Sequence, residues 1–307
     1  MENIDAAMVQ PVTPTPITPL STRDLPGALA LSASAGWNQS EADWRTMLQL
    51  GQGWGIRTQG EGGAEVLAAS VVTMPYGAAV AWISMVLVLP EYQRRGYASH
   101  LLRHAIAALT SRGLTPILDA TPAGHAVYLQ EGFADTWGFA RYRRERLEAA
   151  RAESTPDTAG HAFATRALHD ADWPAIEALD LPAFGASRIA LLRCLAQRLP
   201  SAARVVEVQG RLCGYVLGRD GREATQIGPL VADDPMLAMS LLNDVLGGLT
   251  GPVVVDLLDH QKALLPWLQQ RGFAFERPFT RMVHGALPAV APGDPTHVVL
   301  AAGPELG

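Results

Sequence analysis

A short basic turn between two regular segments carries the clearest chemical signal in the chain. Residues 93–98 read Gln-Arg-Arg-Gly-Tyr-Ala, after an apolar run over 79–89 that is typical of a buried strand. Apolar residues then recur at helical spacing from Ala98 to Leu109. A helix that begins after such a turn presents unpaired N–H groups and the positive end of its dipole. Together with Arg94 and Arg95, this arrangement predicts a phosphate or pyrophosphate site rather than an ordinary solvated turn.

The turn resembles the acyl-CoA-binding motif of the GNAT N-acetyltransferase superfamily, Gln/Arg-x-x-Gly-x-Gly/Ala. The run from Val86 to Pro90 stands in the position of the family's strand. The resemblance implies acetyl-CoA as co-substrate, with its pyrophosphate on the backbone after Gln93. It also implies that a splayed strand edge holds the pantetheine arm and polarises the thioester carbonyl. The implied CoA contacts are Val86, Leu87, Val88, Arg94, Arg95, Gly96, Tyr97, Ala98, Ser99 and Thr121.

A tyrosine lies where the same resemblance places the acid of the reaction. Tyr128 opens the run Tyr-Leu-Gln-Glu-Gly-Phe, which looks like the family's Tyr-x-x-x-Gly-Phe. An apolar strand over 116–120 and a helix that begins near Pro122 position it. When an amine attacks a thioester, CoA leaves as a thiolate, which a positioned phenol can protonate. Tyr128 is therefore the candidate general acid, and a core aromatic is the alternative role.

The general base is not marked, because the strand before the basic turn carries no acidic residue. His125, in the first turn of its helix, and Asp119, at a strand end, are possible bases, each with a structural alternative. Water could relay the proton instead. The resemblance places Trp37 and Asn38 in a loop over the acceptor pocket, and with Ser84 they are the expected substrate contacts.

Metal ligands are not expected. His100 and His104 lie one helical turn apart, as zinc ligands can, but no third ligand stands at a useful spacing. Cys194 and Cys213 have no metal-ligand spacing and make no disulfide framework, which favours a reducing cytoplasm.

Composition sets limits on function and location. The 307 residues are 48% hydrophobic and 18% charged, with a formal net charge of -6. This balance is typical of a globular protein, argues against a general nucleic-acid binder and is compatible with a cationic amine substrate. No apolar run approaches the ~20 residues of a membrane span, and no signal peptide is indicated. We expect a cytoplasmic, bacterial protein without nucleic-acid or membrane partners, either a monomer or a homodimer.

The order of elements repeats along the chain. Residues 1–15 read as a flexible segment, 16–149 as a catalytic domain that binds acetyl-CoA, 150–161 as a linker and 162–307 as a second domain. Each domain is expected to follow the mixed α/β (α+β) GNAT fold, a twisted mixed sheet flanked by helices. The first domain is expected to end in a closing strand near 141–147.

The second domain departs from the pattern at the turn over 231–235. Asp233 and Asp234 stand there without Gly or any basic residue, and two carboxylates would repel a pyrophosphate. Four residues before Gly272 stands Leu268, not a phenol. One CoA site per chain is therefore expected, with a degenerate second domain that shapes the acceptor site or buries an interface. The apolar end of the chain, 296–307, predicts a strand that returns to a sheet, as in a bacterial subgroup of the family.

These features predict direct acetyl transfer to a primary amine, preferably of a small molecule, with no acyl-enzyme. Two alternatives stay open: a protein lysine or N-terminal acetyltransferase with an open acceptor groove, and a non-catalytic CoA-sensing or interaction module.

Overall fold

The computed structural model describes residues 15–60, 63–145, 163–285 and 294–307. The expected linker over 150–161 and the expected N-terminal segment, apart from residue 15, lie outside these ranges. The described elements follow the repeated order that the sequence predicts.

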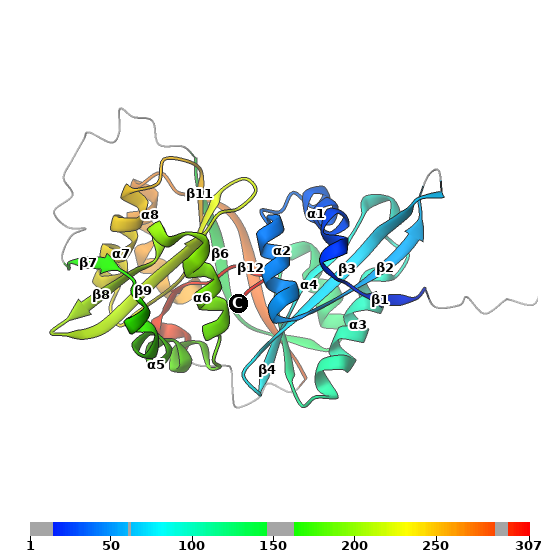
Figure 1. Cartoon of the computed structure of the whole chain (residues 1–307), viewed down its shortest axis with the longest axis horizontal. Coiled ribbons are helices and arrows are strands. Elements are labelled where there is room, and N and C mark those ends of the chain that lie inside the picture. Colours follow the sequence, from blue (N-terminus) through cyan, green and yellow to red (C-terminus); the bar gives the residue numbers. More distant parts are fainter. Residues whose placement is uncertain (1–14, 61–62, 146–162, 286–293) are drawn as a thin grey trace, which may run out of the picture.

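The first half alternates helices and strands around the basic turn (Figure 1). A short 3-10 helix, η3 (Pro90–Tyr92), directly precedes the turn. The other elements are β1 (Ile17–Pro19), α1 (Leu25–Ser34), α2 (Glu41–Leu50), β2 (Gln52–Gln59), β3 (Glu65–Tyr76), β4 (Val80–Val88), α3 (Tyr97–Thr110), β5 (Thr115–Ala120), α4 (Pro122–Gln130) and β6 (Phe133–Arg144).

The second half repeats this order and adds one short strand near the end of the chain. Its elements are β7 (Thr165–Ala167), α5 (Trp173–Phe184), α6 (Ile189–Arg198), β8 (Arg204–Val208), β9 (Arg211–Arg219), β10 (Thr225–Ala232), α7 (Pro235–Gly247), β11 (Val253–Leu258), α8 (Leu265–Gln270), β12 (Ala274–His284) and β13 (Val298–Leu300).

The two halves share one sheet because each gives its last long strand to the other. The thirteen strands run in the order β1-β2-β3-β4-β5-β12-β6-β11-β13-β10-β9-β8-β7. Strand β12 pairs antiparallel with β5 and β6, and β6 pairs antiparallel with β11. The closing strand expected near 141–147 is therefore β6, which begins earlier and joins the second half. The element order gave no sign of this, since it does not specify which neighbour a strand pairs with.

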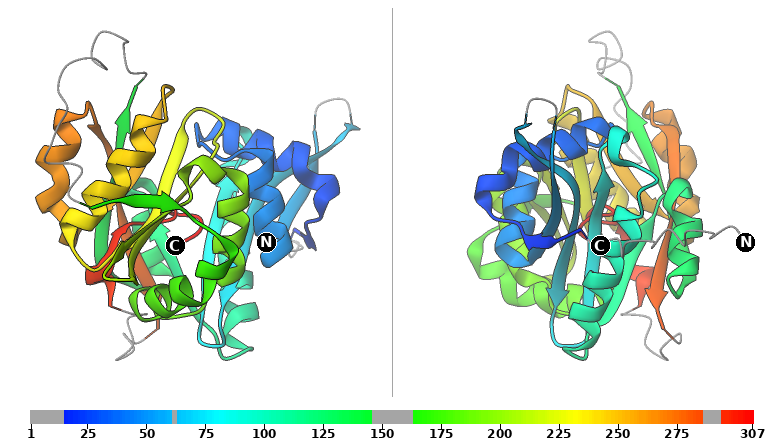
Figure 2. Two further views of the ribbon diagram at one scale, coloured as in Figure 1. Left: turned by 60° about the vertical axis from the view of Figure 1, so that its left-hand side comes forward. Right: turned by 90° about the vertical axis from the view of Figure 1, so that its right-hand side faces the viewer.

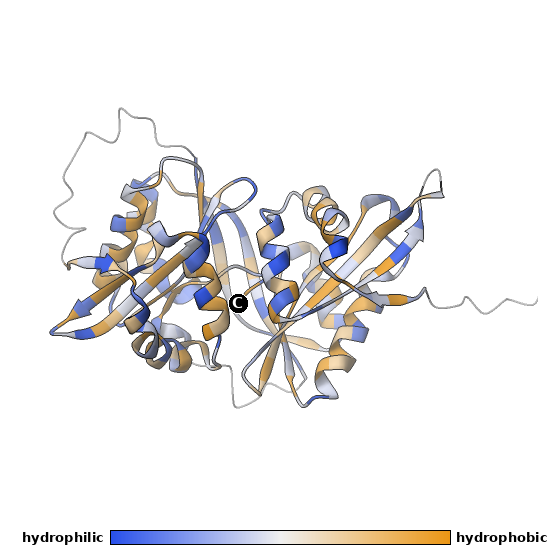
Figure 3. Cartoon of the chain, viewed as in Figure 1, coloured by the Kyte–Doolittle hydropathy of each residue, from blue (hydrophilic) through white to orange (hydrophobic). Residues whose placement is uncertain are grey.

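Helices cover both faces of the twisted sheet (Figure 2). Alternate residues of β3 face opposite ways: Val72 and Met74 pack with α1 and α2, whereas Val71 packs with α3. Apolar residues gather on the strands within each half and on the helix faces that meet them, whereas β6 and β12 carry more hydrophilic residues (Figure 3). The hydrophobic core that contains Val72 and Met74 extends across both halves. In it the Trp82 ring stacks on Phe184 of α5, with 5.6 Å between the ring centroids.

Buried ion pairs accompany the exchanged strands. Arg141 of β6 and Asp256 of β11 are cross-strand neighbours, and the guanidinium donates to both carboxylate oxygens at 2.7 and 2.8 Å. Their side chains are 3% and 0% exposed. Removing one partner of such a pair leaves an uncompensated buried charge.

Asp256→Asn should therefore lower the free energy of unfolding by about 3–5 kcal/mol. Chemical denaturation followed by circular dichroism measures this change. Arg45→Ala is the control, because its pair with Glu41 is 55% and 50% exposed. The control should cost about 0.5 kcal/mol or less. Equal losses in the two variants would contradict the role given to the buried pair.

Candidate active site

An opening between β4 and β5 forms the first part of the site. The two strands are parallel and pair only from Val80–Thr115 to Trp82–Ile117, whereas β4 stays paired with β3 as far as Val88. The β4 register against β3 shifts near Met85, whose φ is 52°, and the Ser70 hydroxyl donates to the Met85 carbonyl at 2.8 Å. Such a bulge beside a free strand edge turns backbone groups into the opening.

The basic turn lies at the end of this open edge. Arg94 and Gly96 have φ values of 60° and 80°, so both adopt the left-handed conformation. Gly96 is the N-cap of α3, and no side chain caps that helix. The first N–H groups of α3 are thus free of any side-chain cap and carry the positive end of the dipole. Arg94 and Arg95 are both exposed, and Arg95 donates to the Glu91 carbonyl at 3.0 Å.

Tyr128 faces the opening from α4. The Thr121 hydroxyl caps this helix by accepting from the Gly124 N–H at 3.3 Å. The Tyr128 ring lies against Gly124, where an added Cβ would come within 2.8 Å of the ring atom Cε2. Burial raises the pKa of the Tyr128 hydroxyl to about 12. The hydroxyl therefore keeps its proton at neutral pH.

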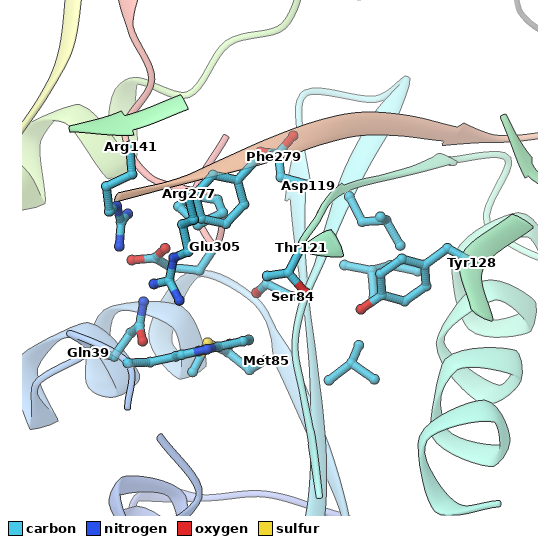
Figure 4. A pocket seen from close by; sticks show the side chains of 15 residues that line it. Gln39, Ser84, Met85, Asp119, Thr121, Tyr128, Arg141, Arg277, Phe279 and Glu305 are labelled. Atoms are coloured by element: carbon cyan, nitrogen blue, oxygen red, sulfur yellow. The ribbon is translucent and has the colours of Figure 1, made fainter. Parts of the chain in front are cut away.

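One pocket joins these parts to residues of the second half (Figure 4). Its empty space is about 480 Å³, a volume that includes open solvent at the mouth. Tyr128 lies at one end, Ser84 and Thr121 lie between, and Gln39, Arg277 and Glu305 lie together at the other end (Figure 4). The lining residues are Trp37, Gln39, Ile83, Ser84, Met85, Val86, Leu118, Asp119, Thr121, Tyr128, Arg141, Arg277, Phe279, Pro304 and Glu305.

Two charged residues of the pocket are already paired. Both oxygens of Asp119 accept from Arg281 of β12, at 2.8 and 2.9 Å, and the Asp119 side chain is 0% exposed. Burial raises the pKa of Asp119, and Arg281 opposes that rise. Arg141 is likewise bound by Asp256. Asp119, one of the two possible bases, lines the pocket, but each of its carboxylate oxygens accepts from Arg281, which makes it unsuitable as a general base.

The last residues of the chain reach the pocket through the second half. Strand β13 lies between β10 and β11, with Leu300 beside both Leu230 and Leu257. The opening between β10 and β11, equivalent to that between β4 and β5, is therefore filled by the chain itself. This confirms the strand predicted within 296–307. The segment continues between the halves, where the Tyr76 hydroxyl donates to the Leu306 carbonyl at 2.7 Å and Glu305 enters the pocket.

Two predicted residues lie elsewhere. His125 is not among the pocket residues, and its Nε2 lies 2.8 Å from the Asp135 carboxylate. Asn38 binds the second half instead of facing the pocket: its amide donates to the Ala224 carbonyl at 2.9 Å and accepts from the Glu223 and Ala224 N–H groups. The adjacent Trp37, together with Ser84, does line the pocket.

No pattern in the sequence marks five further residues of the pocket, namely Gln39, Arg141, Arg277, Phe279 and Glu305. All but Gln39 come from exchanged strands or from the last residues of the chain, so no local spacing connects them with the basic turn. The sequence held one signal for the charged members of this set: each is a charged residue within or beside an apolar segment. In the part of the chain that the structure describes, no three His, Cys, Asp or Glu side chains gather as a metal site would require. No helix in the same ranges is long and apolar enough to cross a membrane.

Comparisons with known proteins agree with this geometry. Residues 31–133 match the model of the acetyltransferase (GNAT) family, and residues 176–292 match a second model, an acetyltransferase (GNAT) domain. The chain is 24% identical over 249 residues to the uncharacterized N-acetyltransferase YitH of Bacillus subtilis, covering 80% of this chain and 83% of that protein.

Solved structures share the fold over nearly the whole chain. A putative acetyltransferase from Pyrococcus horikoshii superposes with a TM-score of 0.75 at 17% identity, covering 97% of this chain and 98% of the other. A tandem GNAT protein from the clavulanic acid biosynthesis pathway gives a TM-score of 0.60 at 19% identity, covering 89% and 99%. The two family matches fall in the two halves of the chain, and the second match includes the exchanged strand β12. The chain therefore belongs to the GNAT acetyltransferase family, as an N-acetyltransferase built from two tandem GNAT domains.

Proposed function

We propose that the first domain transfers the acetyl group of acetyl-CoA directly to a primary amine of a small molecule. The pocket supports this most strongly, because it joins the open β4 edge and Tyr128 to a far end lined by the second half. Strand β12 and the segment after β13 lie where a polypeptide acceptor would need an open groove. A small amine suits such a pocket better than a protein lysine does.

Acetyl-CoA would lie along the features that the first half provides. The backbone over 94–99 would bind the pyrophosphate at the start of α3, and Arg94 and Arg95 would add charge. The pantetheine arm would follow the free edge from Val86 to Val88. An N–H group turned outward near the Met85 bulge would donate to the thioester oxygen as negative charge develops there.

The reaction consists of one displacement. The amine nitrogen attacks the carbonyl carbon, the carbon–sulfur bond breaks, the nitrogen loses a proton and CoA leaves as a thiolate. Tyr128 is the acid on the sulfur side. With a pKa of about 12, against about 8.5 for a free thiol, complete transfer of its proton would be unfavourable by about 5 kcal/mol. The hydroxyl therefore acts chiefly by donating a hydrogen bond to sulfur in the transition state, and the proton shed by the amine finally neutralises the thiolate.

We propose that water carries the proton away from the amine. Asp119 is bound through both oxygens to Arg281, and His125 pairs with Asp135 outside the pocket. Of the routes the sequence left open, the water relay needs neither of these side chains.

The second domain would bind no CoA. Strand β13 fills its β10–β11 opening. At the start of α7, the Asp234 carboxylate already accepts from the Met236 N–H at 2.7 Å, and Asp233 pairs with Arg211 at 2.8 Å. The helix terminus that could have received a pyrophosphate is thus occupied by the chain's own carboxylate.

The Tyr128 hydroxyl should ionise about two pH units above a free tyrosine, whose pKa is 10.0. Burial favours its neutral form, so the unfolded chain loses this proton first and the fold loses stability as pH rises from about 10 to about 12. The phenolate absorbance of the wild type minus that of Tyr128→Phe isolates this one group. A difference signal that rises near pH 10 would contradict the burial of the hydroxyl.

Tyr128→Phe should lower kcat by about 10²-fold while leaving the Kd for acetyl-CoA nearly unchanged. The lost hydrogen bond acts only on the departing sulfur, so binding of the intact thioester does not depend on it. Thiol release at saturating amine measures kcat, and calorimetry measures the Kd. Tyr142→Phe, a phenol of β6 that does not line the pocket, is the matched control. Full turnover in Tyr128→Phe would remove its assigned role.

Calorimetric titration with acetyl-CoA should give one site per chain. Replacing Arg94 and Arg95 together by Ser should weaken binding about tenfold or more, since each can contact a phosphate charge. Arg211→Ser, which removes the arginine paired with Asp233 of the equivalent turn, should not change the affinity. Two sites would show that the second domain binds CoA after all, and no binding would refute the proposed function.

A further inference from the structure

We propose that the acceptor is an amine that also bears a carboxylate, as an amino acid does, and that Glu305 and Arg277 hold these two groups. The inference rests on the proposed function, because it concerns the acceptor of that same reaction. It comes from two buried polar atoms of opposite charge that the chain itself leaves open at one end of the pocket.

Glu305 has one free carboxylate oxygen. The residue is 2% exposed, and its Oε1 pairs with Arg219. Arg219 is shared, since its Nε also lies 3.0 Å from Asp43. The other oxygen, Oε2, is buried and has no hydrogen-bond partner among the described residues. A buried carboxylate oxygen without a donor is costly, so a ligand N–H at this position would be stabilising. The ammonium group of the acceptor supplies such donors.

Within the described ranges, Arg277 has an unsatisfied hydrogen-bond donor, whereas Glu305 has an unsatisfied acceptor. Its Nε is buried without a hydrogen-bond partner in the described chain. The carboxylate paired with it is that of the neighbouring Glu276, at 3.5 Å, which is longer than a hydrogen bond. Burial and the nearby Arg141 lower the pKa of Arg277, and the carboxylates of Glu276, Asp256 and Glu305 offset this change only in part. A planar guanidinium binds a carboxylate through paired N–H donors, which suits an anionic group on the acceptor.

The remaining charges of the pocket do not compete for the ligand. Asp119 is held by Arg281, and Arg141 by Asp256. Glu305 and Arg277 come from different segments, and their side chains lie near each other at the end of the pocket away from Tyr128 (Figure 4). The ion pairs found among the described residues do not join them to each other. A ligand that carries both an ammonium and a carboxylate can bridge the space between them.

This pairing separates acceptor classes. A simple alkylamine would satisfy Glu305 but leave Arg277 unmatched. The N-terminus of a polypeptide has the ammonium group but an amide in place of the carboxylate. An amino acid, whose two charges are neighbours, matches both residues at once, whichever of its nitrogen atoms is acetylated.

Thiol release from acetyl-CoA tests the inference with the full-length protein. The twenty standard amino acids are compared with their carboxamides and with their decarboxylated amines. At least one amino acid should exceed its own carboxamide tenfold or more in kcat/KM. Arg277→Met should bring this ratio close to one by raising KM for the amino acid, and Glu305→Gln should raise KM for the amino acid and its carboxamide alike. Neither variant should change the Kd for acetyl-CoA.

Two controls separate contact with the acceptor from structural damage. Arg143→Met removes an arginine of the adjacent strand β6 whose side chain is 28% exposed, as that of Arg277 is, but which does not line the pocket. Asp43→Asn removes the other carboxylate bound to Arg219, also outside the pocket. Both should keep the preference for the carboxylate. Glu305→Asp, which retains the charge, should recover part of the lost affinity.

Each outcome decides something. Equal rates for amino acids, carboxamides and decarboxylated amines would overturn the inference and leave the proposed function intact. An undiminished carboxylate preference in Arg277→Met would overturn it as well, as would an equal rise in KM in Asp43→Asn and Glu305→Gln. If no compound released thiol although acetyl-CoA bound, the proposed function would fail, and this inference with it.

Discussion

The position of β12 between β5 and β6 is the constraint on which the rest of the molecule depends. Backbone N–H and C=O groups in a sheet must be paired, and here the partners of each half's last strands lie in the other half. Separating the halves would expose strand edges on both sides, so they form one structural unit. The same exchange brings Arg281 beside Asp119 and places Arg277 and Phe279 in the pocket of the first domain.

Buried ion pairs between the halves favour one relative alignment of the two. Arg141 with Asp256 and Arg281 with Asp119 each bridge the two halves with side chains at most 6% exposed. Such pairs add little net stability compared with apolar contacts, but each becomes unfavourable if its partner moves away. They therefore favour one alignment of the halves. Glu305 Oε2 and Arg277 Nε differ from these pairs, because neither atom has a hydrogen-bond partner among the described residues, and we propose them as ligand contacts.

The two domains use the same opening in different ways. Between β4 and β5 the strand edge is free, and a bulge, a basic turn and a phenol surround it. Between β10 and β11 the chain inserts its own strand, which then carries Glu305 toward the first domain. Filling one opening thus completes the wall of the other. Under the proposed function, the second domain would contribute to acetyl transfer as part of the acceptor site rather than as a second catalytic centre.

The sequence by itself determined the family, the repeated order of elements and the local parts of the site. The basic turn at 93–98 and Tyr128 can be found because each depends on residues close together in the chain: a strand, a glycine with positive φ, a capped helix. Four other features could not be found in this way. Strand β6 pairs with β11, Asn38 hydrogen-bonds to the second half, Arg281 forms an ion pair with Asp119, and Glu305 lines the pocket. They depend on contacts between residues 115 to 230 positions apart, for which no local periodicity or spacing exists. Only the tertiary structure decided them, since the folded sheet alone brings those side chains together.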